Sequence, residues 1–160
     1  LAERDAEIAL SPGIRWGATL LPGEPVTWED VYNACAITYP ACYRTVMTGA
    51  AIRAILEDVA DNLFNPDPYY QQGGDMVRVG GLGFTIEVDR PIGQRILDLV
   101  LLRTGATLEP GRAYVVAGWG SVRQAAEGPA IWDVVARHLG RVRTVTAAPA
   151  GRVKIVRGGM

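Results

Sequence analysis

The chain has 160 residues and a mass of 17.2 kDa, and its 49% hydrophobic and 21% charged residues are typical of one globular domain rather than a disordered chain. Its 16 basic and 17 acidic side chains leave a formal net charge of -1, which excludes the basic excess expected of a general nucleic-acid binder. No stretch approaches the roughly 20 apolar residues needed to cross a bilayer, so the sequence predicts no membrane span.

The first elements are a short strand and a short helix. Residues 7–10, Glu-Ile-Ala-Leu, are typical of a short buried strand that stops at the turn signal Ser11-Pro12-Gly13. Thr27 followed by an acid three residues later is a helix-start signal, and it predicts a helix over residues 28–35. A side chain just past residue 13 therefore lies at the end of a strand.

The next segment predicts extended chain followed by a long helix. Residues 37–47 are rich in β-branched and aromatic types, and Pro40 divides them into two extended pieces. After Thr48, a capping residue, apolar side chains recur every three or four positions and predict one amphipathic helix. The helix should end near Phe64, because the prolines at 66 and 68 cannot continue it.

A long polar and aromatic loop and three strands follow. The loop, residues 65–75, is longer than an ordinary connector, which indicates a functional role. Residues 76–79, 84–88 and 95–102 have strand composition and are separated by glycine and proline. Their spacing predicts an antiparallel meander.

The last part of the chain predicts a strand, a helix and a final strand. Residues 114–117 form an apolar strand that ends in Gly118-Trp119-Gly120, where small residues let the backbone approach a ligand. Apolar positions over 131–139 predict an amphipathic helix, and 152–156 a last strand. No repeat or linker interrupts the chain, so residues 1–160 are predicted to form one α+β domain with a mixed or antiparallel sheet and packed helices.

The sequence offers little catalytic chemistry of its own. The single histidine, His138, lies on the apolar stripe of a predicted helix, which favours a core or rim position over a metal ligand. Cys35 and Cys42 lack metal-ligand spacing, and the sequence leaves open whether they pair or remain two buried thiols. We expect no metal site on this chain, and we expect the isolated chain to bind rather than to catalyse.

An oxyanion is the ligand that the remaining motifs favour. Arg15 follows a predicted strand end, and Arg78 follows the stretch Gly73-Gly74-Asp75, so both guanidinium groups lie near glycine-rich backbone. A fixed guanidinium beside accessible backbone amides suits phosphate or sulfonate, although either arginine could instead form a surface ion pair. The candidate substrate-binding residues are Arg15, Gly73, Gly74, Asp75 and Arg78, with Tyr69, Tyr70 and Trp119 as possible walls of a cleft.

Five motifs taken together resemble the C-terminal domain of the 5'-nucleotidase superfamily. They are Ser11-Pro12-Gly13-Ile14-Arg15, the segments 26–31 and 47–57, Val79-Gly80-Gly81-Leu82 and the segment 111–117. The resemblance covers nearly the whole chain and implies that Arg15 contacts the substrate. The Pro-Phe and Gly-Gly-Asp-Gly stretches with which nucleotidases position the nucleoside are replaced here by Ala36-Ile37 and by residues 125–128.

A narrower resemblance is to the SoxB family of thiosulfohydrolases, carried by the run 56–81 together with Ala117-Gly118-Trp119 and residues 131–135. It implies a periplasmic two-domain enzyme of thiosulfate oxidation whose N-terminal metallophosphatase domain, absent from this chain, holds two Mn²⁺ ions. It also implies a substrate: a cysteine S-thiosulfonate on the SoxYZ carrier protein, hydrolysed with release of sulfate. The start at Leu1 rather than Met fits a piece of such a longer protein.

Two other functions remain open from the sequence. The first is the C-terminal domain of an ordinary 5'-nucleotidase or cyclic-nucleotide phosphodiesterase, which shares the metal chemistry but takes another substrate. The second is a non-catalytic module that recognises the carrier or assembles a complex. Assays of the full-length protein with AMP and with loaded carrier distinguish the nucleotidase from the thiosulfohydrolase. A set of metallophosphatase ligands upstream of this chain would distinguish either enzyme from the non-catalytic module.

Overall fold

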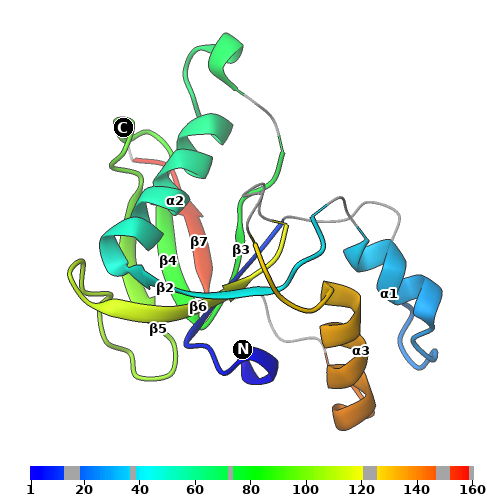
Figure 1. The fold of residues 1–160 in the computed structure, drawn as a ribbon. Coiled ribbons are helices and arrows are strands. Elements are labelled where there is room, and N and C mark those ends of the chain that lie inside the picture. The colour runs from blue at the N-terminus through cyan, green and yellow to red at the C-terminus, as the bar shows by residue number, and fades with distance from the viewer. Residues whose placement is uncertain (13–18, 37–38, 72–73, 121–125, 147–151, 159–160) are drawn as a thin grey trace.

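The computed structural model describes residues 1–12, 19–36, 39–71, 74–120, 126–146 and 152–158 (Figure 1). In chain order the elements are η1 (Ala2–Arg4), β1 (Ile8–Ser11), α1 (Trp28–Cys35), β2 (Tyr43–Thr48), α2 (Gly49–Leu63), η2 (Pro68–Tyr70), β3 (Arg78–Gly80), β4 (Leu82–Glu87), β5 (Ile96–Leu101), β6 (Ala113–Gly118), α3 (Ile131–Val142) and β7 (Val153–Val156). The mixture of sheets and helices confirms the predicted α+β class. No helix of the described residues is long and apolar enough to cross a membrane.

Four strands form the sheet that carries the candidate site. Their order is β2-β6-β1-β3, with β1 parallel to β6 and antiparallel to β3, and with β2 antiparallel to β6. The central strand β1 contributes Ile8 and Leu10 to the core, as its apolar run predicts. Consequently the last residues of β1 and β6 and the first residues of β2 and β3 lie at the same edge of the sheet.

The other three strands form a second sheet, and this corrects the predicted meander. Its order is β5-β4-β7, with β4 antiparallel to β5 and parallel to β7. β3 pairs with β1 in the first sheet instead of with β4, so the chain changes sheets at Gly81. Gly81 has a φ of +79°, and a β-carbon there would lie 2.3 Å from the carbonyl oxygen of Glu7. Composition identified the strands, but it could not reveal this left-handed pivot between them.

The long helix α2 joins the two sheets through one core. Thr48 caps it by accepting a hydrogen bond from the amide of Ala51, as the sequence predicts. The helix contacts β2 of the first sheet and β5 of the second. Its side chains Ile52 and Leu56 are completely buried, and they pack in one cluster with apolar residues from both sheets. This core holds the first sheet rigid behind the candidate site.

Two charged side chains are buried beside α2. The Glu57 carboxylate accepts hydrogen bonds from the backbone amides of Arg95 and Ile96, at 2.8 and 2.9 Å. The Arg95 guanidinium pairs with Asp61 and donates to the carbonyl oxygens of Val88 and Phe64. Because each buried charge has fixed partners, the network fastens the start of β5 to α2.

The helices α1 and α3 pack against each other at one side of the sheets (Figure 1). α1 spans the predicted residues and begins at the predicted capping box, in which Thr27 and Asp30 each accept a hydrogen bond from the other's backbone amide. The Asp30 carboxylate also accepts a hydrogen bond from the Thr27 hydroxyl, and the bonds from the Thr27 amide and hydroxyl lower the pKa of the Asp30 carboxyl. A small buried cluster holds the helix pair to the sheet: Cys35, Cys42, Ile131 and Val134. No disulfide joins the two buried cysteines.

Candidate functional site

Four segments distant in sequence meet at one edge of the first sheet. Tyr43 of β2 lies opposite Gly118 of β6, and Gly118 lies opposite Leu10 of β1. On the other side of β1, Ser11 lies opposite Arg78 of β3. The edge therefore unites the end of the first strand, the predicted Arg78 and the backbone that leads into Trp119.

Glycine at position 118 lets an aromatic ring close this edge. A β-carbon on Gly118 would lie 2.3 Å from the Tyr43 hydroxyl and 2.8 Å from the Leu10 carbonyl oxygen. The tyrosine ring thus packs directly over the glycine, a close approach that no larger residue allows. The sequence predicts that the backbone of Gly118-Trp119-Gly120 approaches a ligand, whereas the close contact recorded at Gly118 is with Tyr43, which the sequence did not single out.

A groove with a volume of about 890 Å³ runs from this edge toward α2. Its lining includes the following residues: Ser11, Pro12, Tyr43, Arg44, Thr45, Met47, Ile55, Asp58, Val59, Val77, Trp119, Gly120 and Glu127. Apolar side chains from α2 and β2 form much of the wall, and a few polar groups lie among them. This composition is typical of a site for a small ligand or a narrow peptide.

The charges that line the groove are mixed. Asp58 and Glu127 supply carboxylates, and Arg44 is the one cation among the described lining residues. The Arg44 guanidinium is already engaged, because it donates to the carbonyl oxygens of Arg4 and Asp5 and pairs with the Asp5 carboxylate at 3.6 Å. A bound anion would therefore need a cation from outside the described lining.

Arg78 is such a cation at the same edge. Its side chain is exposed at the start of β3, and it forms no ion pair with the residues that the structure describes. Its neighbour Val77 lines the groove. Arg78 thus lies at the rim of this edge, next in sequence to a residue that lines the groove, and the alternative of a surface ion pair finds no support among the described residues.

The other predicted site residues lie outside the groove or outside the described residues. Arg15 and Gly73 belong to the residues that the structure does not describe. Gly74 and Asp75 are exposed on the segment that leads into β3. Tyr69 and Tyr70 lie in η2, beyond the end of α2 (Figure 1), and are 95% and 66% exposed. Trp119 is the predicted wall residue that lines the groove.

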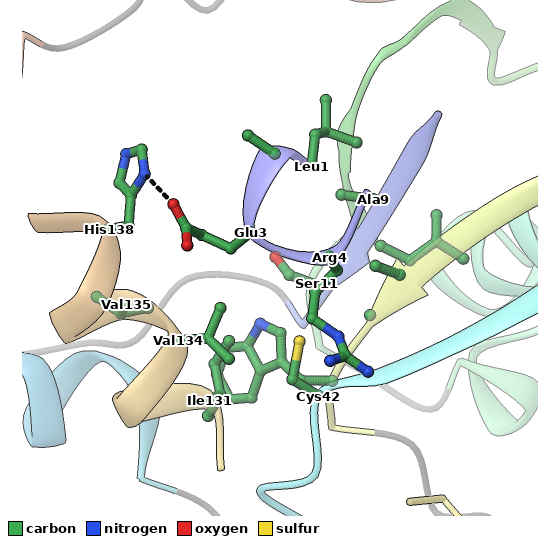
Figure 2. Close-up of a pocket in the computed structure, with 15 residues that line it drawn as sticks. Leu1, Glu3, Arg4, Ala9, Ser11, Cys42, Ile131, Val134, Val135 and His138 are labelled. Carbon is green, nitrogen blue, oxygen red and sulfur yellow. Dashed lines mark ion pairs between the residues drawn. The ribbon is translucent and has the colours of Figure 1, made fainter. Parts of the chain in front are cut away.

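A second cavity, of about 290 Å³, lies between α3 and the strands β1 and β6 (Figure 2). Leu10, Ser11 and Trp119 line both cavities, so the second cavity adjoins the groove at this edge of the sheet. The Nε of Arg4 is buried at this cavity and has no hydrogen-bond partner among the described residues. Burial raises the pKa of the Cys42 thiol, although the nearby Arg4 charge opposes the shift. Cys42 is therefore a neutral thiol at neutral pH.

An ion-pair clasp at this cavity ties the start of the chain to α3. The Glu3 carboxylate accepts hydrogen bonds from the Arg141 guanidinium at 2.7 and 3.0 Å, and it lies 3.5 Å from Nδ1 of His138 (Figure 2). The hydrogen bond from Arg141 is the main cause that lowers the pKa of Glu3 below its ordinary value of 4.5. His138 thus lies at the rim of the cavity and takes part in the clasp.

This clasp predicts an acid-sensitive contact. The pKa of Glu3 is lower in the folded chain than its ordinary value of 4.5. The clasp therefore stabilises the folded state fully above pH 4.5, and this stabilisation is lost as the pH falls through the pKa of Glu3 in the folded chain. A carboxyl-carbon NMR titration should give a Glu3 midpoint below 4.5 that returns toward 4.5 in Arg141→Ala. A wild-type midpoint at or above 4.5 would contradict the contact.

The described residues contain no group of three or more His, Cys, Asp or Glu side chains that could hold a metal ion. A dinuclear metal centre of the kind that the sequence resemblance implies needs such a group for each ion. These residues therefore do not fit the metal pair. What the edge and groove can do chemically is bind: an arginine at the rim can orient an anion, and aromatic walls can hold an apolar stem.

The fold and this edge place the chain in a known class. Residues 1–137 match the family model for the 5'-nucleotidase C-terminal domain, and the chain belongs to that family. Among solved structures it is similar to the SoxB sulfate thiohydrolase of Thermus thermophilus, with 38% sequence identity and a TM-score of 0.86 over 95% of this chain.

Two 5'-nucleotidases share the fold at lower identity. A putative 5'-nucleotidase of Staphylococcus aureus is 16% identical over 99% of this chain, with a TM-score of 0.72. A 5'-nucleotidase precursor of Thermus thermophilus is 20% identical over 94%, with a TM-score of 0.73. The chain spans 29% of the SoxB chain and 34% and 32% of these two. A search of curated proteins finds no match.

Proposed function

We propose that this chain is the substrate-binding portion of a SoxB-like thiosulfohydrolase. The observation that carries the proposal is the contrast in identity: 38% with SoxB, against 16% and 20% with two nucleotidases of the same fold. The substrate would be a cysteine S-thiosulfonate on a SoxYZ carrier in the periplasm. Water adds to the sulfonate sulfur, the S–S bond breaks, sulfate leaves and a persulfide remains on the carrier.

The residues present indicate which part of the reaction this chain would perform. The described side chains offer no ligand set for two Mn²⁺ ions, so an upstream metallophosphatase domain would hold these ions. Hydroxide activation is the chemistry that such metals supply. This chain binds the sulfonate with a rim arginine, and Trp119 and Tyr43 line the approach for the carrier's peptide arm.

The test of substrate class uses the full-length protein with manganese. We expect sulfate release from carrier loaded with thiosulfonate and no phosphate release from AMP. Hydrolysis of AMP without hydrolysis of the loaded carrier would replace this proposal by a nucleotidase function. Failure with both substrates would favour the non-catalytic module.

A second measurement identifies the arginine that binds the sulfonate. In the full-length protein we expect Arg15→Ala or Arg78→Ala to lower kcat/KM for the loaded carrier by about 100-fold, the effect of removing one donor from developing negative charge. Arg103→Ala, an exposed arginine in the turn after β5, is the matched control and should leave turnover unchanged. Unchanged turnover in both test variants would remove both arginines from the reaction.

A further inference from the structure

Three aromatic side chains form a continuous row on the helix pair. The rings of Trp28 and Tyr32, one turn apart on α1, stack with centroids 5.8 Å apart. Tyr32 also contacts Trp132 of α3, with centroids 5.8 Å apart and planes tilted by 55°. We call Trp28, Tyr32 and Trp132 the aromatic row.

The core does not account for the two members of the row on α1. The buried face of α1 consists of Val31 and Cys35, whereas Trp28 is 53% and Tyr32 is 44% exposed. The segment before the helix adds three further exposed apolar side chains: Leu20, Leu21 and Val26. So much exposed apolar surface within 18 residues, 19–36, marks a contact surface for another molecule.

In the described residues of α1 and of the segment before it, the charges beside the row are of one sign. Residues 19–36 contain Glu24, Glu29 and Asp30 and no Lys, Arg or His. Asp133, next to Trp132, adds an exposed carboxylate, and the first cation on α3 is Arg137, one turn further on. Carboxylates beside exposed indole and phenol rings attract Lys and Arg side chains through ion pairs and cation–π contacts.

The same charges argue against other occupants. Anionic lipid headgroups and nucleic-acid phosphates would meet carboxylates instead of cations. In a symmetric dimer through this surface, each acidic segment would face its own copy. A protein partner with a basic segment is the occupant that fits both the rings and the charges.

The row also leads toward the candidate site. Trp132 and Trp119 both pack against the buried cluster of Cys35, Cys42, Ile131 and Val134, and Trp119 lines the groove. A protein held on the row therefore lies next to the groove, within reach for a substrate-bearing arm.

We propose that the aromatic row and its flanking carboxylates form the docking surface for the carrier protein, which binds through a segment rich in Lys or Arg. The inference rests on the proposed function for the identity of the carrier. It assigns recognition of the carrier body to α1 and α3, apart from the rim arginine and groove that take the reacting group.

The test is the affinity of full-length protein for purified SoxYZ without thiosulfonate, measured by interferometry at low and high salt. Buried aromatic residues dominate interfaces, so Trp28→Ala should weaken binding by about tenfold or more. Glu29→Gln should weaken it by about three- to fivefold at low salt and much less at 1 M salt, because salt screens exposed charges. Matched controls are Ile92→Ala and Glu109→Gln, an apolar and an acidic exposed residue elsewhere, which should bind normally.

Each other outcome overturns the docking surface. These outcomes are wild-type protein that does not bind the carrier, equal affinity of Trp28→Ala and wild type, and a dimer that Trp28→Ala dissociates. The proposed function fails separately: variant-sensitive binding without any sulfate release keeps the docking surface and removes the hydrolase. Conversely, sulfate release with unaffected variants keeps the hydrolase and removes the docking surface.

Discussion

Glu57→Ala should lower the free energy of unfolding by about 4 kcal/mol, since it leaves two buried amides without an acceptor at roughly 1–3 kcal/mol each. The carboxylate is 6% exposed and receives the amides of Arg95 and Ile96, so water cannot replace it without opening the contact between α2 and β5. Urea unfolding followed by circular dichroism measures the change.

The neighbouring acid provides the control for Glu57. Asp58 is exposed on the same helix, and Asp58→Ala should change stability by no more than about 0.5 kcal/mol. Glu57→Gln keeps one acceptor oxygen and should fall between the two, which also gives a readable result if the alanine variant does not fold. A loss below about 1 kcal/mol in Glu57→Ala would show that the amides find other acceptors.

Gly81→Ala should cost about 3 kcal/mol of stability, the sum of a left-handed backbone penalty of roughly 1 kcal/mol and a backbone clash of roughly 2 kcal/mol. The clash is with the Glu7 carbonyl oxygen, 2.3 Å from the position of a β-carbon. Because the backbone directly before the central strand β1 cannot move as a flexible side chain does, relief requires the two sheets to shift. The same unfolding assay measures this cost.

Gly93→Ala separates the two contributions. Gly93 has a φ of +75°, close to that of Gly81, yet nothing lies within 4 Å of a β-carbon there. It should therefore show the backbone penalty alone, about 1 kcal/mol. Equal losses of unfolding free energy in Gly81→Ala and Gly93→Ala would mean that the backbone at Gly81 adjusts. The contact between Gly81 and the Glu7 carbonyl would then not fix the position of the two sheets.

Local patterns were sufficient for the helices. The capping box at Thr27 and the cap at Thr48 give the starts of α1 and α2, and the apolar spacing after residue 131 gives α3 with three more residues than predicted. Each of these signals depends on residues within one or two helical turns, so it can be read from a short stretch of sequence. The strands β1 and β6 lie within a residue or two of their predicted bounds. Of the two extended pieces predicted in residues 37–47, the second corresponds to β2, whereas residues 39 and 40 of the first are not in a strand and residues 37 and 38 lie outside the described residues.

Strand partners were the part of the fold that the patterns could not supply. The predicted meander is wrong because pairing depends on a single left-handed glycine and on contacts between distant segments, such as Ala9 with Gly80 and with Ala117. The parallel pairing of β7 with β4 is likewise invisible in the composition of residues 153–156. The composition of a strand indicates which of its residues are buried, but it does not indicate which strand pairs with it.

The candidate site was predictable only where a segment has an unusual local sequence pattern. The Gly118-Trp119-Gly120 stretch stands out in sequence, and Trp119 lines the groove. Tyr43 and Arg44 were missed because each looks like an ordinary strand residue until β2 pairs with β6. The roles of Tyr69, Tyr70 and Asp75 remain predictions from the sequence.

The central pairing of β1 with β6 also governs when the site comes into existence. Leu10 meets Gly118 across more than 100 residues of chain, and Ser11 meets Arg78 across more than 60. Closing loops of this length is entropically costly and slow, so we expect the edge to assemble late in folding, after the local helices. An event that separates these strands would therefore take apart the edge on which the proposed ligand site depends.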